Sequence, residues 1–439
     1  MLPRLTRSLF PHNQLVKAFN QELLDLDVLY PGFIMFIQLI AFLFLSFTAY
    51  TAFFSSSSDE YELDHDIIAE NEEMPQPSTS DKNAVISLAM GYGIGIFETF
   101  IKSLRYTSCE ADIILGVKGE ILLQKEFPEL FEKYHVRAIP WDLIQKETCD
   151  QESTIKSKSE AYGFQITKDI ASLLCTESIG PELTRYVFYE QVVEHYVEPN
   201  GQVFIADFRD TFFQRDPFEH FSDYLGGAHL MAFEELDAEK LGFWDTEWIE
   251  KTDNYTGDPG FSFTTHWVDS CFGLDEKTKG QTVLCSGTIG GTAFGMKDYL
   301  MRYLAKIQEM MIIGDEQACI LTKGVDQGYH NFLIYSVDWQ FAVKIEKNAE
   351  GVVNTMGRPC SRHGMQFPLD EGVTVDPLGF ALNVDKSRSV VLHQYDRCLM
   401  KNGDLYSQIL SSKVLPLMSE MKSDGDVTDQ NQEGIKTQA

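Results

Sequence analysis

The most chemically suggestive stretch of the chain is VFIADFRDTFFQRDPF, residues 203–218, in which two carboxylates follow an apolar run. Residues 203–206 have the character of a buried strand, and Asp207, Arg209 and Asp210 come directly after it. Buried carboxylates need a cation, because without one their pKa rises and they protonate. That cation is either a divalent metal ion, which carboxylate oxygens bind well, or a base such as Arg209 in a structural ion pair. The residue types alone leave both interpretations open.

Alternating strand and helix patterns surround these acids. Continuous apolar runs that end in glycine predict buried strands over 84–93 and 111–119, and a third strand is predicted over 136–141. Helical spacing predicts helices over 96–106, 122–134 and 180–197, the last leading into the strand before Asp207. This alternation predicts an α/β fold with a mostly parallel sheet flanked by helices. Ligands bind at the carboxyl ends of parallel strands, which is where the acids are expected.

Residues 32–54, GFIMFIQLIAFLFLSFTAYTAFF, carry no formal charge and are numerous enough to cross a hydrocarbon core. A buried core helix and a cleaved signal peptide are the alternatives; the segment is too uniformly apolar for the first and too long and too far from the N-terminus for the second. Arg4, Arg7 and Lys17 precede it, and no Lys or Arg follows until Lys82. The positive-inside rule therefore predicts a cytosolic tail over 1–31 and a single-pass type II anchor over 32–54.

The charge and composition of the chain limit which partners it can bind and where its folded domain lies. The formal net charge is −30, from 66 acidic and 36 basic residues, and such a surface repels phosphate backbones, which argues against nucleic acid. An anionic substrate would need a local cation. Residues 55–83 are acidic and contain Ser and Pro, which predicts a disordered stalk, and 419–439 predicts a disordered tail for the same reason. One folded domain over 84–418 remains.

The cysteines agree with exposure to an oxidising compartment. All eight follow the apolar segment, and an even number there permits disulfides, with buried free thiols as the alternative. The sequence Asn254-Tyr255-Thr256 is an acceptor for N-glycosylation. The eight are Cys109, Cys149, Cys175, Cys271, Cys285, Cys319, Cys360 and Cys398.

Four motifs in order resemble those of GT-A nucleotide-sugar glycosyltransferases. They are ADFRDTFFQRDPF (206–218), CSGTIGGT (285–292), DQGYHNFLIY (326–335) and VVLHQYDR (390–397). The first is similar to a strand ending in D-x-R-D, the second to an N-S-G-x-x-G-G loop with Cys285 in place of Asn, the third to a D-Q-x-x-x-N helix, and the fourth to a terminal strand. The resemblance covers roughly residues 84–398 and implies a Golgi type II glycosyltransferase with a lumenal catalytic domain.

The resemblance also implies roles for particular residues. Asp207, Asp210 and His393 are the implied ligands of Mn²⁺, or of Mg²⁺, with the imidazole favouring Mn²⁺. Asp326 and Gln327 are the implied catalytic pair that binds sugar hydroxyls, although Asp326 could instead cap its helix. Trp244, Trp248 and Trp267 are candidates for stacking on an acceptor sugar, or core residues. The remaining donor-binding candidates are Gly91, Arg185, Arg209, Ser286, Gly287 and Gly290.

Two departures from the family pattern keep other functions open. The usual motif is D-x-D, with two acids separated by one residue. Here Arg209 stands where the second acid is expected, and Asp210 comes one residue later. Alternate residues of a strand share a face, so Asp207 and Asp210 reach one ion only if the chain turns. Otherwise one acid binds the metal and Arg209 meets the diphosphate or braces the loop. The implied reaction transfers a sugar from a nucleotide-diphosphate donor to a glycan or glycoprotein. The resemblance to groups with a histidine ligand late in the sequence, here His393, favours retention of the anomeric configuration. The alternatives are an inactive anchored glycan-binding or scaffolding relative, and a nucleotidyltransferase or phosphohydrolase.

Overall fold

The computed structural model describes residues 83–150, 158–176, 179–235, 271–273, 276–313, 325–362, 365–368, 374–400 and 402–423, all in one compact unit. The predicted tail and membrane anchor, and the predicted stalk up to residue 82, lie outside these ranges. Within them, no helix combines the length and the apolar character that crossing a membrane requires.

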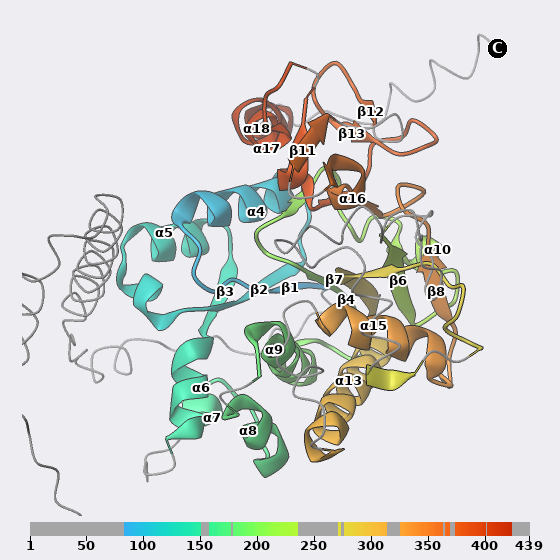
Figure 1. Ribbon diagram of the computed structural model, residues 1–439. Helices are drawn as coiled ribbons and strands as arrows, with labels where there is room; N and C mark the ends of the chain where they lie inside the picture. The colour runs from blue at the N-terminus through green and yellow to red at the C-terminus, as the bar shows by residue number, and fades with distance from the viewer. Residues whose placement is uncertain are drawn as a thin grey trace, which may run out of the picture. The chain divides into compact units, whose positions relative to one another are not determined.

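A seven-stranded sheet forms the centre of the fold, with the order β3-β2-β1-β4-β7-β6-β8 (Figure 1). Every neighbouring pair is parallel except the two that involve β7, which runs against β4 and β6. The predicted α/β fold with a mostly parallel sheet is therefore confirmed. The strands are β1 (Ala84–Leu88), β2 (Asp112–Val117), β3 (Val136–Pro140), β4 (Gln202–Ala206), β6 (Leu230–Glu234), β7 (Leu284–Thr292) and β8 (Val343–Glu346).

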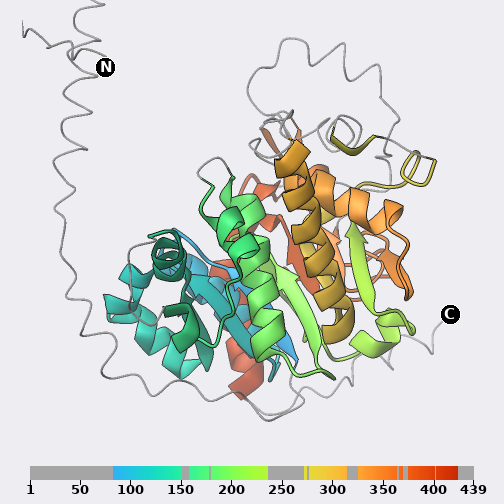
Figure 2. The same ribbon diagram turned by 90° about the horizontal axis from the view of Figure 1, so that it is seen from below.

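Helices cover both faces of this sheet. One face packs against α6 (Trp141–Cys149), α8 (Lys168–Leu174), α9 (Pro181–Tyr196), α13 (Ala293–Ile313) and α15 (Val325–Ser336). Figure 2 shows α9 in green and α13 in gold lying side by side across it. The other face packs against α4 (Ile94–Tyr106), α5 (Glu126–Lys133) and α10 (Phe221–Leu225). The two apolar layers make β1, β2 and β4 buried on both sides, which explains their continuous apolar runs.

A smaller sheet, β5-β14-β9, brings the end of the chain beside the first acidic motif. Its central strand β14 (Val391–His393) is antiparallel to β5 (Thr211–Phe213) and parallel to β9 (Val353–Thr355). His393 pairs with Thr211 in this register, so the late motif lies next to the turn after β4. The paired strands β5 and β14 are far apart in the sequence, so local sequence patterns could not predict that they pair.

The C-terminal part packs as a third apolar cluster around β14. It includes α16 (Gly357–Cys360), α17 (Tyr406–Ile409) and α18 (Leu415–Ser423), with the short strands β10 (Ser361–Arg362), β11 (Met365–Pro368), β12 (Thr374–Val375), β13 (Ala381–Leu382) and β15 (Cys398–Leu399). The domain boundary predicted at residue 418 is wrong, because α18 continues to Ser423. Leu415 and Met418 are buried and hold this helix to the domain. At the other end, the backbone of Asn83 accepts a hydrogen bond from Asp112, so Asn83 belongs to the fold and not to the stalk.

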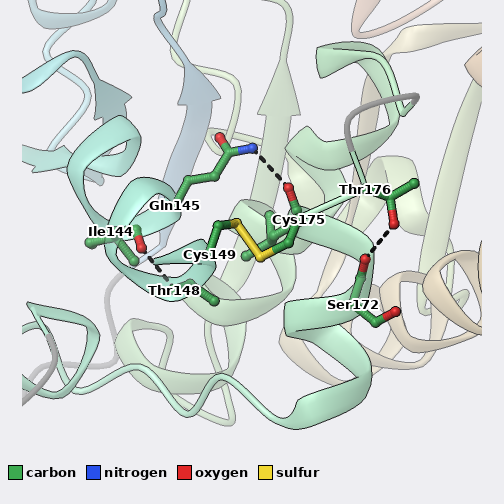
Figure 3. Close-up of a disulfide and its surroundings, with 8 residues drawn as sticks. Ile144, Gln145, Thr148, Cys149, Ser172, Cys175 and Thr176 are labelled. Atoms are coloured by element: carbon green, nitrogen blue, oxygen red, sulfur yellow. Dashed lines mark hydrogen bonds between the residues drawn. A yellow bond between two sulfur atoms is a disulfide. The ribbon is translucent and has the colours of Figure 1, made fainter. Parts of the chain in front are cut away.

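Two disulfides are present between described residues, and Cys271 is also disulfide-bonded. Cys149–Cys175 joins the end of α6 to the residue after α8 (Figure 3). Cys360–Cys398 joins α16 to β15 within the C-terminal cluster. Cys109 and Cys285 are buried free thiols. Both of the predicted states of the cysteines, disulfide-bonded and buried as free thiols, therefore occur in this chain.

Candidate metal and donor site

The two acids after β4 lie in a turn between β4 and β5, which satisfies the condition for Asp207 and Asp210 to meet. The backbone N–H of Asp207 donates to the carbonyl of Gly287 on β7 at 2.7 Å, and this bond fixes the start of the turn. The Asp210 side chain is 6% exposed and that of Asp207 is 33% exposed. One carboxylate is therefore part of the interior and the other faces the site.

His393 completes a cluster with these two acids. Its Nε2 atom lies 3.8 Å from a carboxylate oxygen of Asp207 and 3.8 Å from one of Asp210. His393 is fully buried, and its Nε2 has no hydrogen-bond partner among the described residues. Ligand atoms of the three residues lie within 4.8 Å of one another. The structure thus brings together the three residues that the sequence predicts as metal ligands.

The donor set fits a divalent cation. Carboxylate and imidazole together suit Mn²⁺, and neighbouring ligands of an octahedral ion with bonds of about 2.1 Å are about 3 Å apart. A buried Nε2 without a partner, aimed at two carboxylates beyond hydrogen-bonding distance, is the arrangement that such an ion would complete. The residues present therefore agree with the predicted metal class.

The electrostatics of the cluster favour a positive charge between the two acids. Burial raises the pKa of Asp210 although His393 opposes the shift. Burial would also raise the pKa of Asp207, but Arg185 and His393 outweigh it and hold that pKa well below its usual range. Burial disfavours charge on His393, yet its Cys285 and carboxylate neighbours raise its pKa well above the ordinary value. The positive charge can come from a proton on His393 or from a cation.

Arg185 on α9 links Asp207 to the third motif. One terminal nitrogen pairs with Asp207 and the other with Asp326 on α15 at 2.8 Å. Asp326 is buried and accepts a further hydrogen bond from Ser286 Oγ at 2.9 Å, so its side chain belongs to the site and does not cap α15. The Arg185 side chain is 13% exposed, so this ion-pair bridge lies mostly inside the protein. Burial raises the pKa of Asp326, and Arg185 opposes the shift.

Gln327 points to a different acid. Its amide donates to Glu235, the residue after β6, at 2.6 Å. Four residues further along α15, Asn331 accepts from the backbone N–H of Leu284 and donates to its carbonyl, both at 2.8 Å. The D-Q-x-x-x-N motif therefore has two parts: its acid joins the cluster, while Asn331 fastens α15 to the start of β7.

Arg209 is the accessible cation of the site. Its side chain is 49% exposed and lies 3.4 Å from Asp210 and 3.3 Å from Asp396. The Tyr92 ring lies 5.9 Å from that of Phe208 in the same turn. Burial raises the pKa of Tyr92, Arg209 opposes the shift, and the acids Asp207 and Asp210 add to it. The preceding Gly91 has a φ of +83°, and a Cβ at this position would meet nothing within 4 Å, so the β1–α4 turn leaves open space there.

The glycine-rich motif differs from its prediction. The sequence predicts a loop with Ser286, Gly287 and Gly290 against a sugar, but the motif is strand β7 in the middle of the sheet. Gly287 lies against His393 and Asp207, whereas Gly290 packs on Phe221 in the core. Gly290 as a donor-binding residue is therefore a wrong prediction, because its missing side chain makes room for an aromatic ring.

Some predicted residues are not described by the structure, and some site residues were not predicted. Trp244, Trp248, Trp267 and Asn254 lie outside the described residues. Sequence reasoning did not identify Tyr92, Glu235 or Asp396 as members of the site, although Asp396 stands in the HQYDR motif and Tyr92 lies at the end of the strand predicted over 84–93. Glu235 carried no signal, since its contact with Gln327 depends on the sheet order.

No protein-family model and no curated protein sequence matches this chain. Among solved structures, it is similar to the galactosyltransferase LgtC in complex with donor and acceptor sugar analogs, at 11% identity over 80% of this chain and 99% of that one, with a TM-score of 0.36. It is also similar to the glycosyltransferase GlyE of Streptococcus pneumoniae TIGR4 (13% identity, 79% and 64% covered, TM-score 0.35). A third similar structure is mouse xyloside xylosyltransferase 1, apo form (11% identity, 62% and 87% covered, TM-score 0.34). Likenesses at these scores do not assign a family.

Proposed function

We propose that this protein is a metal-dependent glycosyltransferase of the GT-A type, which moves a sugar from a nucleotide-diphosphate donor to a glycan or glycoprotein. The observation that carries the proposal is the convergence of four motifs distant in sequence. Asp207, Ser286, Asp326 and His393 come one from each motif, and contacts through Arg185 and Gly287 connect them. A chance resemblance of four short patterns gives no reason for them to meet.

The charge balance of the site explains why a cation belongs to the proposal. Around Arg185, Arg209 and His393 lie four carboxylates, those of Asp207, Asp210, Asp326 and Asp396. A diphosphate would be repelled by them in a chain of net charge −30. A divalent ion held by Asp207, Asp210 and His393 would neutralise the diphosphate as it leaves.

The protein's own residues then have separable tasks. Arg209 offers exposed guanidinium donors that suit phosphate oxygens. Arg185 orients Asp207 and Asp326 and is occupied by both, so we assign it a positioning role in place of the predicted donor contact. Asp326, held by Arg185 and Ser286, presents a fixed carboxylate for hydroxyl groups of the transferred sugar. We keep Mn²⁺ as the metal, and the predicted Golgi location with a lumenal domain as part of the proposal.

The test is calorimetric titration of UDP and of GDP into the purified full-length chain, with Mn²⁺ and with EDTA. Asp207→Asn removes one candidate ligand charge while keeping the shape that contacts Arg185. We expect nucleotide binding that needs Mn²⁺ and that falls at least about tenfold in Asp207→Asn. Asp298→Ala, which removes an acid paired with Arg302 on α13, is the matched control and should bind normally.

The products distinguish the other functions. Transfer releases a nucleoside diphosphate, whereas a nucleotidyltransferase or phosphohydrolase releases pyrophosphate or a nucleoside monophosphate. If neither nucleotide binds under any condition, the catalytic proposal is wrong and an anchored scaffold remains. If binding ignores Mn²⁺ and EDTA, the metal is wrong and Arg209 is left as the phosphate-binding group.

A further inference from the structure

The free thiol of Cys285 lies directly behind the candidate metal ligand His393. Its Sγ atom is 3.3 Å from His393 Nδ1, the ring nitrogen opposite the one that faces the two acids. Cys285 is 1% exposed, so the contact belongs to the interior. The side-chain amide of Gln394 is also directed to this sulfur, at 4.0 Å. Two nitrogens thus converge on Sγ from the chain segment that carries His393.

The strand geometry of β7 accounts for this placement. Alternate residues of a strand share a face, so Cys285 and Gly287 point to one side and Ser286 to the other. On the first side, Gly287 leaves room for the His393 ring, since a Cβ there would lie 2.6 Å from Nε2. On the second side, Ser286 reaches Asp326. The strand therefore supports the histidine with one face and the Asp326 carboxylate with the other.

We propose that Cys285 is a positioning residue that fixes the tautomer and orientation of His393 for metal binding. Nε2 can bind a cation only through its lone pair, which requires the ring hydrogen to be on Nδ1. Cys285 Sγ is placed to accept that hydrogen, and ligating histidines are generally held by such an outer partner. The unpartnered, buried Nε2 aimed at Asp207 and Asp210 is the independent sign that this histidine serves a ligand. The inference depends on the metal site of the proposed function.

The test measures Mn²⁺ affinity of the full-length chain directly, by the electron paramagnetic resonance signal of free Mn²⁺. Cys285→Val keeps similar volume in a strand and removes the acceptor, while Cys285→Ser restores an acceptor. We expect Cys285→Val to weaken Mn²⁺ binding roughly tenfold or more and Cys285→Ser to recover most of it. Cys109→Val, at the other buried free thiol, is the matched control and should bind Mn²⁺ as the parent chain does.

Substitution with Co²⁺ supplies a readout that does not depend on affinity. We expect the d–d absorption bands of the bound Co²⁺ to change in Cys285→Val, because the imidazole is no longer oriented, and to show no thiolate charge transfer in the parent chain. A thiolate band would make Cys285 a ligand and overturn the positioning role. Equal losses in Cys285→Val and Cys285→Ser would overturn it as well, because the acceptor would then not matter.

Two further outcomes separate this inference from the proposed function. If Asp207→Asn weakens Mn²⁺ binding but Cys285→Val leaves it unchanged, the metal site stands and the role of Cys285 is wrong. If the parent chain binds no Mn²⁺, or binds it independently of Asp207, the metal site itself is wrong and the inference fails with it.

Discussion

At Gly287 the central sheet lies directly against two of the candidate metal ligands. A Cβ there would lie 2.5 Å from His393 Cε1, 2.6 Å from its Nε2 and 2.7 Å from an Asp207 oxygen. Because a real Cβ does not approach atoms this closely, Gly287→Ala must displace both ligands. We expect at least about tenfold weaker Mn²⁺ binding, measured by electron paramagnetic resonance.

The matched control is Gly290→Ala, on the same strand. Its Cβ would meet the Phe221 ring at 2.6 Å, so this variant should lose about 1–3 kcal/mol of unfolding free energy and retain Mn²⁺ affinity. Equal Mn²⁺ affinities in Gly287→Ala and the parent chain would show that His393 and Asp207 do not bind the ion together.

At the residue scale, the sequence predicted the three candidate metal ligands. Asp207, Asp210 and His393 were identified because their types suit a cation and their motifs suggested one place. Gly290 was misassigned because a glycine needed for packing and one needed beside a ligand look the same in a sequence. Glu235 could not be identified, since its contact with Gln327 arises only from the order of β6, β7 and α15 in space.

At the scale of elements, the sequence predicted the β-α alternation of the first half and failed at β7. The motif CSGTIGGT resembles a loop because strands seldom contain three glycines. The structure explains the last two: Gly290 makes room for the Phe221 ring, and Gly291 lies against the backbone of His229, so a side chain would not fit at either position. The small sheet β5-β14-β9 was also beyond local patterns, because β5 is far from β9 and β14 in the sequence.

The contact of α15 with α13 predicts a pH dependence of stability. His330 on α15 is fully buried, its Nδ1 lies 2.7 Å from the Tyr299 hydroxyl of α13, and burial lowers its pKa from 6.5 to about 3. Between these two values the unfolded chain binds a proton that the folded chain does not, so the stability falls as the pH falls. This residue alone should remove about 2 kcal/mol of unfolding free energy between pH 7 and pH 5.

The variant that isolates this effect is His330→Asn, whose amide replaces Nδ1 beside Tyr299 and does not titrate. We expect its unfolding free energy, measured in urea at pH 7 and pH 5, to depend less on pH than that of the parent chain by about the same amount. Measurements above pH 7, where the histidine is neutral in both states, serve as the control and should show parallel behaviour. An unchanged pH dependence would mean that His330 has the same pKa in the folded chain as in the unfolded chain.

At the scale of the whole molecule, the disulfides and the predicted membrane anchor both bear on the proposed lumenal location. The disulfides Cys149–Cys175 and Cys360–Cys398 join residues that are 26 and 38 positions apart in the sequence. By the loss of loop entropy in the unfolded chain, each contributes about 3–4 kcal/mol to the free energy of unfolding. Such bridges form in oxidising compartments. Residues 32–54 and the basic residues before them predict that the domain is carried into one. The cysteine count suggested this from the sequence, but the pairing required the folded chain.

This location makes a prediction about the full-length chain in sealed microsomes. If the domain is lumenal, added protease should remove only the short N-terminal tail, and detergent should expose the rest, because the membrane separates the two sides. The sequon at Asn254 should then be glycosylated, so that an endoglycosidase increases the gel mobility of the parent chain and not that of Asn254→Gln. The conservative Asn200→Gln, at an exposed asparagine outside any sequon, is the control and should keep the shift. Digestion of the whole domain without detergent, together with no glycosylation, would place the acids and their donor on the cytosolic side and overturn the type II topology.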